Sequence, residues 1–109
     1  MAQFDVHRNK GALRESIPFV VLVQSAQFDR YRRRMVVPLV RRSALPGNTS
    51  TVGSRMNPAF QVEGIDVVLH PLDMVSVALD QLGEHAGSLA DQGQAIADAL
   101  DELLTRSWG

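Results

Sequence analysis

The 109-residue chain contains no cysteine, and only 6% of its residues are aromatic. Without cysteine the chain has neither a disulfide framework nor a thiolate metal site, so we expect a reducing cytoplasm as its location. No apolar run approaches the roughly 18 residues that a membrane-spanning helix needs. The first ten residues, MAQFDVHRNK, also lack the apolar segment of a signal peptide. We therefore predict a soluble cytoplasmic protein that does not engage a membrane.

Motifs that carry chemistry are equally scarce. The sequence has no glycine-rich phosphate loop and no nucleophile elbow. His7, His70 and His85 are far apart, and none has a second type of ligand at metal-binding spacing. We predict no catalytic residue, no metal and no cofactor, which favours a binding protein over an enzyme.

The net charge is only −1, but the two halves of the chain differ sharply. Residues 1–59 contain ten Lys or Arg against three acidic residues, a charge of +7, whereas residues 60–109 contain Arg106 against nine acidic residues, a charge of −8. Such asymmetry either orients partners or draws the two parts of the molecule together.

Residues 1–82 are rich in short strand patterns. Alternating or β-branched apolar runs occupy residues 3–7, 18–24, 35–40 and 74–79, and residues 59–70 read as a hairpin that turns at Glu63-Gly64. Pro38 removes a ladder donor, so we predict a sheet edge or a bulge there. Residues 43–54 read as a loop, and Gly83 as the end of the strand region. Five or six short strands predict a small sheet or barrel.

The end of the chain has helical periodicity from about residue 88 to 106. Ser88 and Asp91 resemble a capping box, and Gly93 should weaken the middle of the helix by about 1 kcal/mol relative to alanine. We predict one amphipathic helix, packed on the sheet or on a partner, within a single domain of residues 1–109. The apolar residues with this spacing are Leu89, Ile96, Ala97, Leu100, Leu103, Leu104 and Trp108.

A run of arginines stands out in the first half: Arg30, Arg32, Arg33 and Arg34, with Tyr31 among them. Arginines interleaved with an aromatic residue can bind a phosphate backbone. Alternatively, Arg33 and Arg34 begin a strand and pair with acidic groups of the same chain. The second interpretation is favoured, because one short basic stretch on an acidic protein is weak support for nucleic-acid binding.

Five segments in a fixed order carry a family resemblance: QFDV, FVVLVQS, RRRMVVPL, LDMVSVALDQLGE and a terminal helix that closes on WG. Together they resemble the CcdB family of bacterial toxins over essentially the full chain. The stretch Arg33–Leu39 is the most specific part. The resemblance implies a mainly β fold with one long C-terminal helix, an SH3-like barrel or twisted antiparallel sheet, assembled as a homodimer.

The resemblance also implies a function and partners. CcdB-like toxins bind the DNA gyrase A subunit with the paired C-terminal ends of the dimer and trap gyrase with cleaved DNA, without catalysing a reaction themselves. A CcdA-like antitoxin folds an acidic tail onto the toxin, and the two together bind operator DNA and repress their operon.

Matched to the family pattern, the gyrase-contacting residues are Trp108, Gly109, Ser107, Leu104, Phe28 and Gln27. Several of them depart from that pattern. Ser107 replaces an aromatic residue, Leu104 a polar amide and Gln27-Phe28 two isoleucines, while the isoleucine after the final glycine is missing. A groove lined by Arg30, Arg32, Arg33 and Arg34 is the expected docking surface for the acidic antitoxin.

Two alternatives stay open at this point. One is an endoribonuclease toxin of the MazF/Kid type, which shares the fold, although the Gly-Ser-Glu turn of those enzymes is absent before Arg33. The other is a CcdB homologue that no longer poisons gyrase and is kept for antitoxin binding, which the changes at the C-terminal end would explain.

Overall fold

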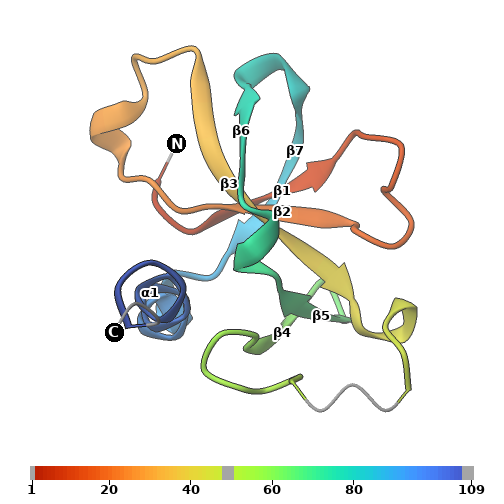
Figure 1. The fold of residues 1–109 in the computed structure, drawn as a ribbon. Coiled ribbons are helices and arrows are strands. Elements are labelled where there is room, and N and C mark those ends of the chain that lie inside the picture. Colours follow the sequence, from red (N-terminus) through yellow and green to blue (C-terminus); the bar gives the residue numbers. More distant parts are fainter. Residues whose placement is uncertain (1, 48–50, 107–109) are drawn as a thin grey trace.

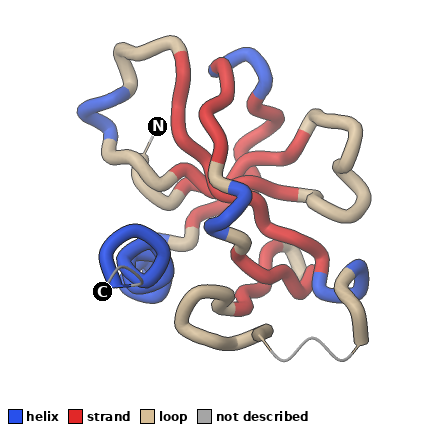
Figure 2. The backbone as a smooth tube through the Cα atoms, viewed as in Figure 1, coloured by secondary structure: helices blue, strands red, loops and turns tan. Residues whose placement is uncertain are grey.

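The computed structural model describes residues 2–47 and 51–106. These residues form one seven-stranded antiparallel sheet and a C-terminal helix (Figure 1), which confirms the predicted mainly β fold with one terminal helix. The sheet is strongly curled, like half of a barrel (Figure 2). Its strand order is β4-β5-β3-β2-β1-β7, and β6 pairs with β3 off this path. The strands are β1 (Asp5–Asn9), β2 (Phe19–Leu22), β3 (Arg33–Arg41), β4 (Ala59–Val62), β5 (Ile65–Leu69), β6 (Val75–Ala78) and β7 (Leu82–Ser88).

The longest strand, β3, organises the sheet. One of its edges pairs with β2, whereas its other edge is divided between β6, which faces Arg33–Val36, and β5, which faces Leu39–Arg41. The prediction that Pro38 marks a sheet edge or a bulge is wrong. Pro38 is buried and lies where the second edge passes from β6 to β5. Its missing N–H therefore falls between two ladders, and a proline is tolerated in the middle of the sheet.

The hairpin predicted for residues 59–70 is confirmed. Strands β4 and β5 pair in register, with Val62 opposite Ile65 and Ala59 opposite Val68. The two residues of the turn both have positive φ, 52° at Glu63 and 77° at Gly64. Two successive positive φ values are typical of the type I′ turn, whose twist matches that of the flanking strands.

Strand β7 is the element that the sequence patterns do not reveal. Gly83 does not end the strand region, as predicted, but lies within β7, which pairs with β1. A Cβ atom at Gly83 would lie 2.6 Å from the carbonyl oxygen of Arg8, so glycine allows these two backbones to approach closely. The sequence of the strand, LGEHAGS, is short of large apolar residues and lacks the alternation by which strands are recognised.

The C-terminal helix begins later than predicted and changes its pitch. It opens with a 3₁₀ turn, η5 (Ala90–Gln92), continues as α1 (Gly93–Asp101) and ends in a π-helical turn, η6 (Glu102–Arg106). Ser88 is the last residue of β7, which delays the helix by two residues. The Ser88 hydroxyl accepts a hydrogen bond from the Ala90 amide at 3.1 Å, rather than from the Asp91 amide that a capping box would use.

The helix packs against the sheet through Leu89, Ile96 and Ala99, which belong to one buried cluster with the inner side chains of the strands. Ala97, expected in the apolar stripe, is exposed. Gly93 is not a weak point in mid-helix but the buried first residue of α1. A Cβ atom there would lie 2.6 Å from the Phe4 ring, so glycine is what lets the helix sit on that ring. The cluster comprises Val6, Phe19, Val21, Val37, Leu39, Phe60, Val62, Val67, Leu69, Leu89, Ile96 and Ala99.

Short 3₁₀ turns connect several strands. The connecting 3₁₀ turns are η1 (Ala26–Phe28), η2 (Arg42–Ala44), η3 (Pro71–Asp73) and η4 (Leu79–Gln81). The described part of the loop predicted at 43–54 is confirmed as irregular, with the end of η2 at its start.

Candidate functional site

Leu104 is the described part of the predicted gyrase-binding end. Its side chain is 62% exposed, although it shares the helical spacing of buried residues such as Ile96. Leu104 lies within the π-helical turn, whose wider pitch takes side chains out of the angular register of the preceding α-helix. Ser107, Trp108 and Gly109, the other predicted contacts at this end, lie outside the described residues.

Gln27 and Phe28 lie in η1, in the loop that joins β2 to β3. Gln27 is exposed and Phe28 is half-buried. The centres of the Phe28 and Tyr31 rings lie 5.9 Å apart. The Arg30 guanidinium lies 5.7 Å from the centre of the Tyr31 ring. The loop thus carries a partly exposed cluster of two aromatic rings and a cation, an arrangement common at interfaces.

Within one chain, the structure does not bring this loop and the helix end together. Figure 1 shows the β2–β3 loop and the C-terminal end of the helix at separate parts of the molecule. A partner that touches both must therefore span the face between them, or touch them on different copies of the chain.

Arg34 is a structural residue of this loop, and its assignment to the antitoxin surface is wrong. Its side chain is fully buried. One Nη donates to Asp29, and the other donates to the backbone carbonyls of Gln24 and Ser25 at 3.0 and 3.2 Å. Because a buried guanidinium needs such partners, Arg34 supports the loop from inside, and its side chain does not reach the surface of the described chain.

Two adjoining hollows open beside the other arginines and share Arg32 and Arg33; we call them the arginine hollows. The first has a volume of about 420 Å³ and combines aromatic and apolar side chains with the two cations. The second, of about 490 Å³, lies against η4 and the end of β6. The residues lining the first are Gln24, Phe28, Tyr31, Arg32, Arg33, Met35 and Ser76; those lining the second are Arg32, Arg33, Ala78, Leu79 and Asp80.

The arginines of these hollows differ in their bonding. Arg33 donates to the hydroxyl and the carbonyl oxygen of Ser76 at 2.9 and 2.7 Å, across the β3–β6 ladder. Arg32 is exposed and its guanidinium has no ion pair with another described residue. The interpretation of the arginine run as part of a strand with ion pairs to the same chain is correct in part. Strand β3 begins at Arg33, and Arg34 pairs with Asp29. Within the described residues, however, Arg30, Arg32 and Arg33 make no ion pair with the acidic helix. A cationic rim beside an apolar hollow is suited to an anionic segment that carries a large apolar side chain.

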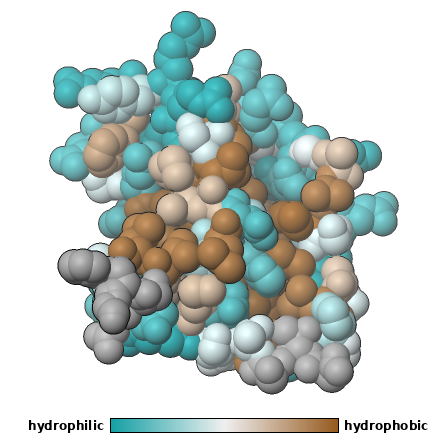
Figure 3. Space-filling model, viewed as in Figure 1, coloured by the Kyte–Doolittle hydropathy of each residue, from teal (hydrophilic) through white to brown (hydrophobic). Residues whose placement is uncertain are grey.

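Exposed apolar side chains also occur in η3 and at the start of β6. Leu72 in η3 is 72% exposed, and Val75 at the start of β6 is 48% exposed. In Figure 3, brown surface extends across the middle of the face in view. Exposed apolar patches of this kind commonly mark protein–protein contacts.

The part of the chain that the structure describes contains no cluster of side chains placed to bind a metal. There, no three His, Asp or Glu side chains converge as ligands. The His7 ring is buried, with Nδ1 3.0 Å from the Gly83 carbonyl oxygen, and His85 Nε2 lies 3.6 Å from a carboxylate oxygen of Asp5. Across residues 2–47 and 51–106, no helix has the length and apolarity to cross a bilayer.

Sequence reasoning missed Met35 and Ser76 as part of the hollow. The register of β3 against β6 places these two residues opposite each other, and no local pattern in either strand announces that pairing. Tyr31 was visible as an aromatic residue among arginines, which is the signal that points to this loop.

Comparison with known proteins identifies the family of the chain but no individual curated relative. No curated protein matches the chain. The model of the family described as CcdB protein matches residues 3–106, nearly all of the 109. The chain therefore belongs to the CcdB family, the toxins of a class of toxin–antitoxin systems.

Proposed function

We propose that the protein is a cytoplasmic gyrase poison, which binds the DNA gyrase A subunit and traps the enzyme with cleaved DNA. The observation that carries the proposal is Leu104, which is 62% exposed in the π-helical turn and lies three residues before Ser107 in the Ser107-Trp108-Gly109 end. Trp108 follows four residues later in the sequence, and tryptophan is among the residue types that dominate binding at protein interfaces. The toxin itself makes and breaks no bond in this account.

The test is accumulation of cleaved DNA when purified protein is added to the gyrase of its host. We expect linear DNA to appear upon denaturation and to fall sharply with Leu104→Glu. Ser43→Glu is the control, since Ser43 is exposed in η2 and lies outside both the helix and the hollow that Val75 lines. Cleavage of RNA by the purified protein, with no effect on gyrase, would instead favour the ribonuclease alternative. Antitoxin binding without either activity would favour a homologue that no longer poisons gyrase.

A homodimer is part of the proposal. Leu72 and Val75 are exposed apolar side chains, and a second copy that covers them would give a dimer with two C-terminal ends available to one target. Stable interfaces bury about 800 Å² on each partner. Analytical ultracentrifugation should give a dimer for the wild type and a monomer for Leu72→Glu, whereas a monomeric wild type would refute this arrangement.

The arginine hollows are the proposed antitoxin site. An acidic segment could place carboxylates beside Arg30, Arg32 and Arg33 and an apolar side chain against Phe28. The antitoxin must pay an ordering cost as its tail folds, so several charge-assisted bonds are needed. In complex with the antitoxin, the toxin would repress its own operon by binding operator DNA; the toxin alone is not expected to bind it.

A pair of matched double variants tests this site. Arg32→Glu with Arg33→Glu should weaken antitoxin binding by at least an order of magnitude, because each charged bond contributes roughly 1.5–3 kcal/mol. Arg14→Glu with Arg42→Glu makes the same change of charge at exposed positions outside the hollows and should have little effect. Equal effects of the two pairs would reduce the site to overall electrostatic attraction, and no effect of the first pair would exclude it.

A further inference from the structure

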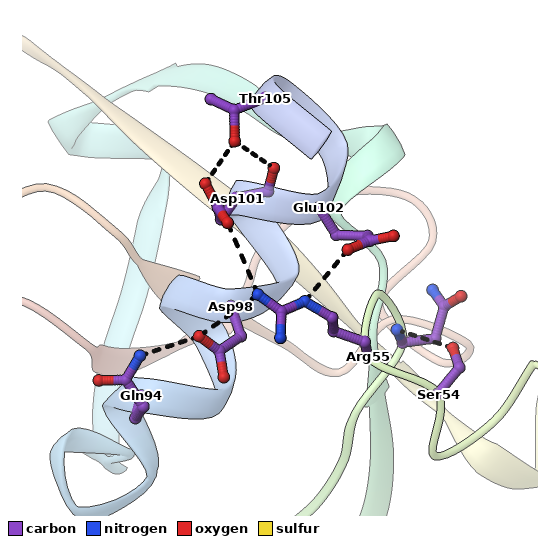
Figure 4. Close-up of polar contacts among 8 residues, drawn as sticks. Ser54, Arg55, Gln94, Asp98, Asp101, Glu102 and Thr105 are labelled. Atoms are coloured by element: carbon purple, nitrogen blue, oxygen red, sulfur yellow. Dashed lines mark hydrogen bonds and ion pairs between the residues drawn. The ribbon is translucent and has the colours of Figure 1, made fainter. Parts of the chain in front are cut away.

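Arg55 joins the irregular segment before β4 to the last turns of the helix (Figure 4). Its Nε lies 3.1 Å from a carboxylate oxygen of Glu102, and one Nη lies 3.5 Å from Asp101 and 3.7 Å from Asp98. We call these four residues the Arg55 network. One cation thus faces three carboxylates, and the first half of the chain meets the acidic second half at this point.

The segment that carries Arg55 is itself fixed to the sheet. The Gly53 amide donates to the carbonyl oxygen of Asn57 at 2.8 Å, which closes the turn around Arg55. The Asn57 side chain then donates to the carbonyl oxygen of Leu69, a buried residue of β5, at 3.0 Å. Arg55 therefore reaches the helix from a base that is hydrogen-bonded to a core strand.

The network coincides with the place where the helix widens. Asp101 is the last residue of α1, and Glu102 is the first of the π-helical turn. The Thr105 hydroxyl donates to the Asp101 carbonyl oxygen at 2.8 Å, so a side chain takes up an acceptor of this turn. Wide turns of this kind are rare and need support from their surroundings.

We propose that Arg55 is a positioning residue, which holds the last turn of the helix in its wide form and so keeps Leu104 turned outward. Arg55 would touch no target itself. The consequence for gyrase binding rests on the proposed function, whereas the effect on the helix end does not.

The exposure of the network separates this role from a role in global stability. The Arg55, Asp98 and Asp101 side chains are 44%, 37% and 47% exposed, and exposed ion pairs add little to the stability of a whole domain. Their effect is local, on the opening of the final turn, and salt should screen it.

Amide hydrogen exchange over residues 102–106 tests the proposal. We expect Arg55→Gln to speed exchange there by about fivefold, with an almost unchanged unfolding temperature, as the loss of exposed ion pairs implies. Arg8→Gln is the matched control, because Arg8 is 46% exposed and also faces two carboxylates, Glu63 and Glu84, but on the sheet. Exchange that stays at the wild-type rate in Arg55→Gln, or rises equally in Arg8→Gln, would overturn the proposal.

Two further measurements address the electrostatic cause. Arg55→Lys keeps the charge and should restore part of the protection, and 1 M NaCl should bring the wild type close to Arg55→Gln. A wild type that is insensitive to salt, beside an Arg55→Gln variant that exchanges rapidly, would contradict an electrostatic role. Faster exchange with unchanged gyrase affinity would support the positioning of the turn by Arg55 and count against Leu104 as a gyrase contact.

Discussion

Replacing Gly83 by alanine tests the close pairing of β1 and β7. The new Cβ atom would lie 2.6 Å from the carbonyl oxygen of Arg8 and 3.2 Å from its carbonyl carbon. Both are backbone atoms of β1, so no rotation of a side chain can relieve the contact. The strands must separate by about 0.8 Å for the closest contact to reach 3.4 Å, where ordinary van der Waals distances begin. The same movement would stretch the contact of 3.0 Å between His7 Nδ1 and the Gly83 carbonyl oxygen.

Two effects of opposite sign determine the change in stability. Alanine lowers the entropy of the unfolded chain and favours a strand, which stabilises the fold by about 0.5–1 kcal/mol. Overpacking against a fixed backbone costs about 1–3 kcal/mol. We therefore expect a net loss of about 1–2 kcal/mol, equivalent to a fall of roughly 5–10 °C in the unfolding temperature of a domain of this size.

Thermal and denaturant unfolding of the purified variant provide the measurement. Gly47→Ala is the control, because no atom of the described residues lies within 4 Å of its added Cβ and its backbone is not in the left-handed region. It should differ from the wild type by less than about 0.5 kcal/mol or be slightly more stable. A Gly83→Ala protein as stable as the wild type would refute the close approach of β7 to β1.

Three other substitutions have expected outcomes that can be measured by the same unfolding experiments. Gly93→Ala should lower stability by about 1 kcal/mol, although helix propensity alone predicts a gain of that size, because the Cβ meets the Phe4 ring; a gain would show that the ring moves aside easily. Arg34→Met should lower the free energy of unfolding by about 3 kcal/mol, since it leaves two loop carbonyls without a donor. Arg34→Lys should recover little of that loss, because an ammonium cannot reach the same acceptors. Wild-type stability of either variant would contradict the role of Arg34 in holding the loop. Gly64→Ala should cost about 1 kcal/mol and Gly64→Asn less, because φ is 77° there and asparagine tolerates that region; equal costs would argue against a type I′ turn.

Local patterns were sufficient to predict much of the fold. The hairpin at residues 59–70 follows from two short apolar runs around Glu63-Gly64, and all the information that specifies it lies within those twelve residues. Strand β7 and Pro38 could not be predicted in the same way. Their environments depend on strands distant in sequence: β7 on the Arg8 backbone, and Pro38 on the interval between β6 and β5.

The candidate site likewise combines features that local sequence predicts with features that only the folded chain determines. The arginine run is visible in the sequence, but nothing local distinguishes the buried Arg34 from the exposed Arg32 and Arg33, because that difference arises from the folding of the loop around one guanidinium. Leu104 has the spacing of a core residue, but it lies in the π-helical turn that begins at Glu102 and is exposed there. Arg55 lies more than forty residues from its carboxylate partners, so no local sequence pattern predicts that they pair.

The central claim is that this chain binds gyrase through its C-terminal end, and direct binding to the gyrase A fragment of its host tests it. Trp108 is the only tryptophan in the chain, and an aromatic anchor at an interface typically contributes at least about 2 kcal/mol. Trp108→Ala should therefore bind about 30-fold or more weakly than the wild type, while Leu13→Ala binds normally. Absence of binding by the wild type, or equal binding by Trp108→Ala, would contradict the account.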